Sequence, residues 1–288
     1  MNDPIIDSLF STNAVRVSDP EAPFWYASGM LGPFYINTHF LLHNEMEAAR
    51  LLSIIETASG TDRFAMPHIL LDHLLAFYER SESFKQVTDA IVAACRGLSF
   101  DFVSGGERRD YFFSILPAYF LHKPHLFIFK DFQSVYADES MTDCVLATEA
   151  DLDGKTALHI ADLVTEASSY LRVWVPVIKN LGAKITDTIA VVDRVQGGRE
   201  ILAGEGISLH ALTAIDTQLF QNALAMKLIS THQYEMVLDY MKDPDTYVRN
   251  FFSTHPGYVE AQIQLGGKAK ERAELAISKG YADPVCEL

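Results

Sequence analysis

The sequence predicts an α/β fold: a parallel sheet flanked by helices, preceded by a small N-terminal segment and followed by a helical extension. Between residues 100 and 216, short apolar runs rich in β-forming residues alternate with amphipathic segments, which is typical of parallel strands joined by crossover helices. Helix signals dominate residues 45–96 and again the residues after 216. A chain of 288 residues accommodates one large domain, or one domain with an appendage.

The elements of the sheet region can be assigned in order. Strands are expected at residues 100–104, 126–129, 156–161, 185–192 and 209–215. Helices are expected at residues 110–121, 171–181 and 199–203. Pro117 should kink or shorten the first of these helices, and Gly182 stands at the expected end of the second. Residues 162–169 are expected to form the loop that leaves the third strand.

The remaining segments suggest two accessory parts. A hairpin region is expected at residues 24–42, and further helices at 218–228, 233–241 and 268–279. We therefore predict one domain over residues 1–216, made of a hood (1–44), a helical insertion (45–96) and a core (97–216). Residues 217–288 are predicted to form a helical C-terminal extension.

Composition narrows the class of function. The net charge of -15 argues against non-specific nucleic-acid binding, which needs a basic surface. A phosphate ligand would have to be held by a few local donors, with a divalent cation. No apolar run reaches the ~20 residues of a membrane span, no signal peptide is visible, and Cys95, Cys144 and Cys286 form no CxxC pair. We expect a cytoplasmic protein without a membrane partner.

The most specific motif is the run V-V-D-R-V-Q-G-G-R-E at residues 191–200, followed by A-G-E-G-I at 203–207. It resembles the orotate phosphoribosyltransferase family, in which a strand ends in Asp-Arg and a Gly-Gly-Arg-Glu helix start leads to a Gly-Ile turn. The resemblance implies a type I phosphoribosyltransferase core. It also implies transfer of ribose 5-phosphate from phosphoribosyl pyrophosphate (PRPP) to orotate, in pyrimidine nucleotide synthesis, with Mg²⁺.

Within this motif the resemblance assigns Arg194 to the base. The family's arginine at this position grips the orotate carboxylate, and a guanidinium offers a rigid fork of donors to such a planar group. The alternative is an exposed arginine paired with Asp193 or Glu200. Both interpretations remain open.

The N-terminal segment carries a second, less complete resemblance. The runs F-W-Y-A-S-G at residues 24–29 and P-F-Y-I-N at 33–37 are similar to the family's hood. The family has a lysine where this chain has Ala27, and that lysine reaches the substrate. Alanine supplies neither charge nor a hydrogen bond, so this contribution is missing.

The segment 161–169, A-D-L-V-T-E-A-S-S, stands where the family has its PRPP loop. Asp162 would hold a ribose hydroxyl, and Thr165, Ser168 and Ser169 would cradle the 5′-phosphate at a helix start. Ala161 lacks the family's second acid, and Ala167 replaces a glycine. Glu166 could repel phosphate by on the order of 4 kcal/mol at about 4 Å. Alternatively it faces solvent and caps the helix dipole.

Two further segments supply candidate cations. Lys130 is the remaining cation of the family's mobile catalytic loop, which crosses to the neighbouring subunit, and Gln133 stands in a lysine position. The resemblance therefore implies a homodimer. Arg108 and Arg109 follow a Gly-Gly turn where the family binds pyrophosphate. They could bind an anion, although we favour surface charges paired with Glu107 and Asp110.

Two functions from different classes follow. The first is an enzyme of the orotate phosphoribosyltransferase type, with activity weakened or altered by the departures at residues 27, 129, 133, 161 and 166. The second is a non-catalytic ligand-binding or regulatory protein that retains the phosphoribosyltransferase fold. Its ligands would be small molecules, PRPP and orotate or a similar base.

Overall fold

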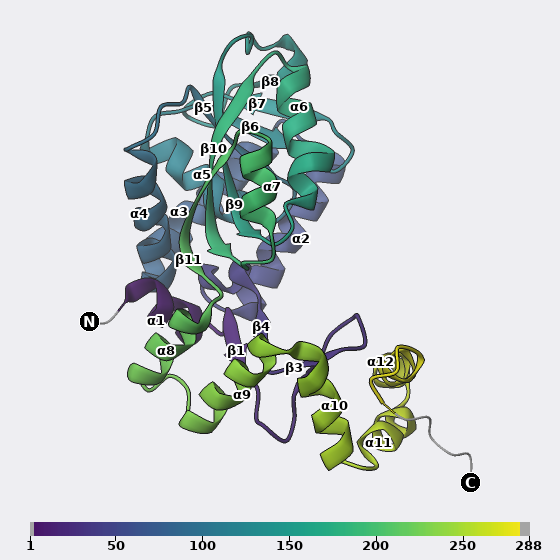
Figure 1. Cartoon of the computed structure of the whole chain (residues 1–288). Helices are drawn as coiled ribbons and strands as arrows, with labels where there is room; N and C mark the ends of the chain where they lie inside the picture. Colours follow the sequence, from purple (N-terminus) through teal and green to yellow (C-terminus); the bar gives the residue numbers. More distant parts are fainter. Residues whose placement is uncertain (1–2, 283–288) are drawn as a thin grey trace. The chain divides into compact units, whose positions relative to one another are not determined.

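A computed structural model describes residues 3–282 of the chain (Figure 1). Contacts among these residues form two units. The first contains residues 3–14 and Asn37–Asp216, and the second contains Val15–Ile36 and residues 217–282. The predicted hood is thus divided between the two units, because its segment Val15–Ile36 groups with the helices after residue 216. Among residues 3–282, no helix has the length and apolar character to cross a membrane.

The first unit is built on a mixed sheet whose order, among the described residues, is β11-β10-β9-β5-β6-β7-β8. Strands β11 to β6 run parallel, and β7 and β8 are antiparallel at one edge. The strands are β5 Phe102–Gly106, β6 His125–Ile128, β7 Ser134–Ala137, β8 Cys144–Leu146, β9 Thr156–Val164, β10 Lys184–Asp193 and β11 Ser208–Ala214. The parallel strands are covered on both faces, which explains the near-continuous apolar runs that made them recognisable.

Helices cover both faces of this sheet, which gives three layers (Figure 1). One face is covered by α1 (Pro4–Ser11), α4 (Glu82–Cys95) and α5 (Tyr111–Phe120), with α2 (Glu45–Thr61) and α3 (Met66–Arg80) packed outside them. The other face is covered by a π-helical turn, η3 (Tyr170–Trp174), and by α6 (Val175–Asn180) and α7 (Gly198–Gly204). A fully buried apolar cluster between this second helical layer and the sheet includes Ile178, Ala190 and Leu202.

The structure confirms the α/β core and changes three details. Strand β9 continues through Asp162 to Val164, because its last residues still pair with β10 at Val192 and Asp193. Pro117 lies inside α5 without ending it. The antiparallel strands β7 and β8 were not predicted. Each is only three or four residues long, too short for a clear periodicity.

The second unit combines two short hairpin ladders with five helices in the described residues. Strand β1 (Val15–Val17) pairs with β4 (Phe34–Ile36), and β2 (Phe24–Trp25) with β3 (Leu31–Gly32). The helices are α8 Thr217–Ala225, α9 Thr231–Lys242, α10 Pro244–Thr254, α11 Tyr258–Leu265 and α12 Gly267–Ser278. Two of them, α10 and α11, were not predicted.

Within this unit the turn that contains Ala27 is fixed against α12. Gly29 has φ +81°, and a Cβ at this position would lie 2.8 Å from the side chain of Leu275. The Lys279 ammonium donates to the Ser28 carbonyl at 2.8 Å. The turn of the hood therefore depends on the C-terminal helix for its position, and only glycine permits the close approach.

Candidate functional site

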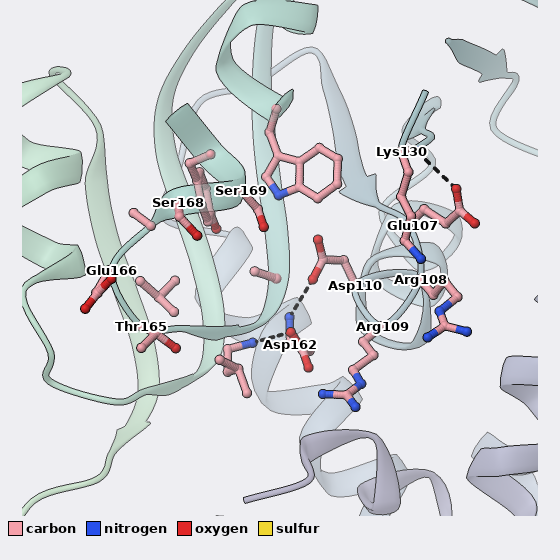
Figure 2. A pocket seen from close by; sticks show the side chains of 16 residues that line it. Glu107, Arg108, Arg109, Asp110, Lys130, Asp162, Thr165, Glu166, Ser168 and Ser169 are labelled. Atoms are coloured by element: carbon pink, nitrogen blue, oxygen red, sulfur yellow. Dashed lines mark hydrogen bonds between the residues drawn. The ribbon is translucent and has the colours of Figure 1, made fainter. Parts of the chain in front are cut away.

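A cavity of about 320 Å³ opens at the carboxyl ends of β5, β6 and β9 (Figure 2). Ligands of parallel α/β sheets characteristically bind at this edge. Its polar lining comes from the turn after β5, the residue after β6, the end of β9 and the loop that follows: Glu107, Arg108, Arg109, Asp110, Lys130, Asp162, Thr165, Glu166, Ser168 and Ser169. Every predicted site residue except Arg194 thus lines one cavity, while their roles in binding remain predictions.

The loop after β9 is held in place by the segment that follows β10. The Arg194 amide donates to the Val164 carbonyl at 2.9 Å, and the Gly198 amide to the Thr165 carbonyl at 2.9 Å. A Cβ on Gly198 would lie 2.5 Å from that Thr165 oxygen, so the approach requires glycine. Ala167 has φ +51°, a left-handed conformation that glycine adopts with less strain. The loop therefore keeps its turn despite the alanine.

Hydroxyl groups and open backbone amides meet at the end of this loop. Ser168 and Ser169 are exposed and immediately precede η3. No side chain of the described residues caps the start of this helical turn, so the amides before Leu171 are available to a ligand, whereas the Leu171 amide donates to the Ala167 carbonyl at 3.2 Å. Figure 2 shows the exposed Glu166 carboxylate turned away from the interior of the cavity. The solvent-facing alternative for Glu166 is therefore the one that the structure supports.

The two arginines after β5 have different environments. Arg108 forms an ion pair with Glu56 of α2. Arg109 has no hydrogen-bond or ion-pair partner among residues 3–282, and Figure 2 shows its guanidinium below Asp162 in the cavity. The expected pairing of both arginines with Glu107 and Asp110 is wrong, because a helix distant in sequence supplies the partner of Arg108. Arg109 is a cation available to an anionic ligand.

Arg109 also affects the titration of a neighbouring histidine. Burial, and then the positive charge of Arg109, lower the pKa of His39 to about 4. His39 is therefore neutral at pH 7, and Arg109 contributes the positive charge of this part of the cavity.

Two buried carboxylates lie at the inner end of the cavity. Asp162 is 8% exposed and Asp110, the residue before α5, is 7% exposed. The Asp162 amide donates to Asp110 Oδ1 at 3.1 Å, the Gly106 amide donates to Asp110 Oδ2 at 3.0 Å, and the Thr38 hydroxyl donates to Asp162 Oδ2 at 2.7 Å. Burial, and then the negative charge of Asp110, raise the pKa of Asp162 to about 7. The cavity thus contains a carboxyl group that titrates near neutrality.

Lys130 begins a tight turn between β6 and β7, where the resemblance implied a mobile loop. The Lys130 amide donates to Glu107 Oε2 at 3.1 Å. Arg63 fixes the rest of the turn: its guanidinium donates to both carboxylate oxygens of Asp131, at 3.2 and 2.9 Å, and to Gln133 Oε1 at 3.0 Å. It also lies 4.2 Å from the centre of the Phe129 ring. Residues 129–133 are thus pinned to a residue of the preceding helical region in the same chain.

Arg194 stands outside the cavity lining. Its neighbour Asp193 pairs with Arg199 at 3.0 Å, so the alternative in which Arg194 bridges to Asp193 is not formed. The Arg194 side chain is half-buried and has no hydrogen-bond or ion-pair partner among residues 3–282. The next residue, Val195, has φ +54° although it is β-branched, which marks a strained backbone beside Arg194.

Known proteins share both sequence and fold with this chain, although no family model matches it. The orotate phosphoribosyltransferase of Sulfolobus acidocaldarius is 25% identical over 158 residues, which cover 55% of this chain and 76% of that protein. The uridine 5′-monophosphate synthase of Bos taurus is 43% identical over 68 residues, 23% of this chain and 14% of that protein.

Two solved structures have the same fold. The UMP synthase of Leishmania donovani superposes with a TM-score of 0.56 at 14% identity, covering 83% of this chain and 41% of that one. The orotate phosphoribosyltransferase of Francisella tularensis gives a TM-score of 0.53 at 12% identity, covering 83% and 98%. The chain is thus similar in sequence to orotate phosphoribosyltransferases over part of its length. Its type I phosphoribosyltransferase fold was predicted correctly.

The two loops of the cavity differ in how far they agree with what the resemblance implied. The loop 165–169 keeps its hydroxyls, whereas the β6–β7 segment is a pinned turn. Sequence reasoning missed Asp110, Thr38 and Arg63, which reach the site from separate elements. For Asp110 a signal was present: an acid at a helix start directly after Arg108 and Arg109. For Thr38 and Arg63 the partners are 124 and 68 residues away, and no local pattern indicates them.

Proposed function

We propose that this chain binds PRPP in the cavity and transfers its ribose 5-phosphate to orotate or a similar base, at a low rate. The observation that carries the proposal is the meeting of three groups in one cavity: the partnerless cation of Arg109, the hydroxyl-bearing loop 165–169 and the carboxyl group of Asp162. These are the donors and acceptors that a phosphorylated sugar needs. The sequence relatives, which are orotate phosphoribosyltransferases, support the choice of base.

In the proposed reaction each side chain has a limited task. The loop amides with Ser168 and Ser169 would bind the 5′-phosphate, and Asp162 would accept from a ribose hydroxyl. Arg109 and Lys130 would face the diphosphate. The bond between ribose C1 and the diphosphate oxygen breaks, the diphosphate leaves with the electron pair, and a base nitrogen forms the new bond to C1 and gives up its proton to solvent. Because charge develops on the leaving diphosphate, cations preorganised around it would contribute most of the catalysis.

We infer the low rate from cationic side chains that the family has and this chain lacks. Ala27 and Gln133 stand where the family has lysines, and Gln133 is bonded to Arg63. Losing one preorganised charge donor costs roughly 10²–10³ in rate. We therefore expect turnover of at most about 0.1 per second, against about 10 per second for an ordinary enzyme.

A second candidate function is ligand binding or regulation without turnover. The pinned turn at residues 129–133 favours it, because closing the site over the diphosphate by this segment would first require breaking the contacts of Arg63. In this case PRPP binds, and the base is bound without reacting.

Other properties of the family remain proposals for this chain. Mg²⁺ would accompany PRPP, but residues 3–282 contain no group of three or more His, Cys, Asp or Glu side chains that could hold a metal, so we assign it no protein ligand. A cytoplasmic location likewise stays a prediction. A homodimer is expected from the family, and light scattering at micromolar concentration should give twice the chain mass of 32.2 kDa. A monomeric mass would refute it.

Calorimetric titration with PRPP and Mg²⁺, followed by orotate, tests the function. We expect saturable PRPP binding that Arg109→Ala weakens and that Arg80→Ala, a matched change beside Glu47 outside the cavity, leaves unchanged. Release of pyrophosphate would then be followed with orotate present. Turnover near 10 per second overturns the low rate. Binding without pyrophosphate release over hours supports the second function, and failure to bind PRPP overturns both.

A further inference from the structure

Two buried carboxylates lie next to each other at the inner end of the cavity. Asp110 and Asp162 are joined by the hydrogen bond from the Asp162 amide to Asp110 Oδ1, and neither forms an ion pair with an arginine or lysine among residues 3–282. Two neighbouring carboxylates removed from water cannot both ionise at ordinary pH without a large electrostatic cost. Burial, and then the negative charge of Asp110, therefore favour the protonated form of Asp162.

His159 completes this group from the interior. It lies on β9, is fully buried, and stacks on Trp174 with ring centroids 5.8 Å apart. Its Nδ1 is 3.0 Å from Ser104 Oγ. Its Nε2 is 3.4 Å from Asp110 Oδ2 but makes no aligned hydrogen bond with any described residue. The carboxylate of Asp110 is thus covered from the interior by a buried ring whose Nε2 has no well-aligned partner among the described residues.

The other titratable groups that face the pair come from several elements: Arg109 from the turn after β5, Tyr111 from α5, Tyr170 from η3 and His39 from the 3-10 helix η1 (Thr38–Leu42) beside Arg109. Burial, and then the negative charge of Asp110, raise the pKa of Tyr170, so the tyrosine does not titrate near neutrality. Arg109 lowers the pKa of Asp162 less than burial and Asp110 raise it. The group whose pKa is raised to about 7 is Asp162.

We propose that Asp162, buried beside Asp110 at the inner end of the cavity, takes up one proton from solvent when an anion binds in the cavity. The anion is of the phosphate or sulfate class and contacts Arg109 and the loop 165–169. The proton stays on the Asp162 carboxylate and returns to solvent when the anion leaves, so no covalent bond to the ligand forms or breaks. This inference rests on the proposed function only in assigning an anion to the cavity.

The direction of the coupling follows from electrostatics. A bound anion places negative charge near the pair and so favours its protonated form. By linkage, a site that gains a proton on binding must bind more tightly as the pH falls. The pKa of Asp162, raised to about 7, puts this change in the neutral range. For one coupled proton we expect the affinity to fall about tenfold between roughly pH 6.5 and 8.5.

Sulfate is the suitable probe because it does not titrate in this range. Its dissociation constant would be measured by calorimetry at pH 6.5, 7.5 and 8.5, at constant ionic strength, in two buffers with different ionisation enthalpies. The difference in heat between the buffers reports the protons exchanged. We expect uptake approaching one proton near pH 7.5 and the tenfold change in affinity across the series.

Matched variants separate this coupling from a purely structural role. Asp110→Asn should flatten the pH profile, and at pH 8.5 it should bind sulfate at least as tightly as the unmodified protein, since a negative charge has been removed. Asp162→Asn should do the same, which guards against misfolding of either variant. Asp187→Asn is the control, because Asp187 also contacts a histidine, His210, at 2.8 Å, but lies outside the cavity. It should keep the original profile.

Each outcome of these measurements either supports or overturns the inference. Sulfate binding that is independent of pH, or a profile that survives in both Asp110→Asn and Asp162→Asn, overturns the inference and leaves the proposed function standing, since PRPP titration tests that separately. Absence of sulfate binding together with intact PRPP binding also overturns the inference. Proton uptake that disappears in the two cavity variants and persists in Asp187→Asn supports it.

Discussion

The ends of β9 and β6 lie at the same edge of the sheet and line the same cavity, but they differ in the polar groups that are available to a ligand. After β9, the hydroxyls of Ser168 and Ser169 and the amides of a helix start are open to a ligand. After β6, the polar groups are already hydrogen-bonded within the chain. The Lys130 amide donates to Glu107, and the side chains of Asp131 and Gln133 accept from Arg63.

This difference separates two tasks that the family combines in one site. Anchoring a phosphate requires fixed donors in a stable frame, and the loop after β9 has such a frame in its bonds to Arg194 and Gly198. Covering the leaving diphosphate requires a segment that can move, and the turn after β6 is held by several contacts at once. Under the proposed function, this chain would keep the means of binding more fully than the means of closing. The predictions that follow test this contrast, beginning with the largest effect.

The largest effect is expected at the buried end of β9. The pKa of Asp162 is about 7 in the folded chain against an ordinary 3.8, so the folded state holds more protons between these values. Its contribution to stability is therefore complete below about pH 4 and is lost as the pH rises through about 7. Asp162→Asn should gain on the order of 2–4 kcal/mol of unfolding free energy at pH 8 and little at pH 4.

Chemical denaturation of both proteins across this pH range measures the gain. Burial lowers the pKa of His39 to about 4 and that of His125 to about 3, so the unfolded chain binds protons at these positions below about pH 6.5 and stability falls there. This opposite trend is common to both proteins and cancels in their difference. A difference in unfolding free energy between the two proteins that does not vary with pH would contradict the raised pKa of Asp162.

The next effect concerns the partnerless cation. Arg109→Ala should weaken PRPP or ribose 5-phosphate binding by roughly 30-fold, since a charged hydrogen bond contributes about 2 kcal/mol. Lys130→Ala, on the pinned side of the cavity, should weaken it less than fivefold if that side contributes little to binding. Calorimetry on both variants makes the comparison directly. Equal losses would show that the two ends of the cavity contribute alike, and the contrast would fail.

A smaller effect is expected from releasing the turn after β6. Arg63→Ala removes a partly exposed bidentate ion pair and a cation–π contact, together about 1 kcal/mol of stability. Amide hydrogen exchange at residues 129–133 should accelerate, whereas ligand affinity should change little. Arg80→Ala, which removes a similar arginine over Phe77, is the control and should leave these amides protected. Unchanged amide exchange at residues 129–133 in Arg63→Ala would mean that the turn stays rigid without the contacts of Arg63.

The smallest effect is expected at Glu166. Because its carboxylate turns away from the cavity, Glu166→Thr should change ribose 5-phosphate affinity by less than about twofold at moderate salt, where distant charges are screened. The titration would be repeated at low salt. A large gain, shrinking with added salt, would show that the carboxylate does approach the phosphate.

How much of this the sequence reveals differs between the core and the site. The parallel strands are readable because each buries both faces, and the loop after β9 because its hydroxyls lie within nine consecutive residues. The acid missing at Ala161 suggested a lost carboxylate, yet Asp110 brings one beside Asp162 from another element. Local comparison of motifs cannot detect this replacement, because the two acids are 52 residues apart.

The sequence by itself determined the fold class, the apolar runs that form the parallel strands and most of the polar groups of the cavity, since these depend on short-range periodicity and contiguous motifs. Only the tertiary structure decided which charges are partnerless and which are bound. Arg108 forms an ion pair with Glu56, whereas its neighbour Arg109 has no ion-pair partner among residues 3–282. It also decided that Asp162 titrates near neutrality. Burial and the approach of distant charges set these properties, and both arise only when separate elements pack together.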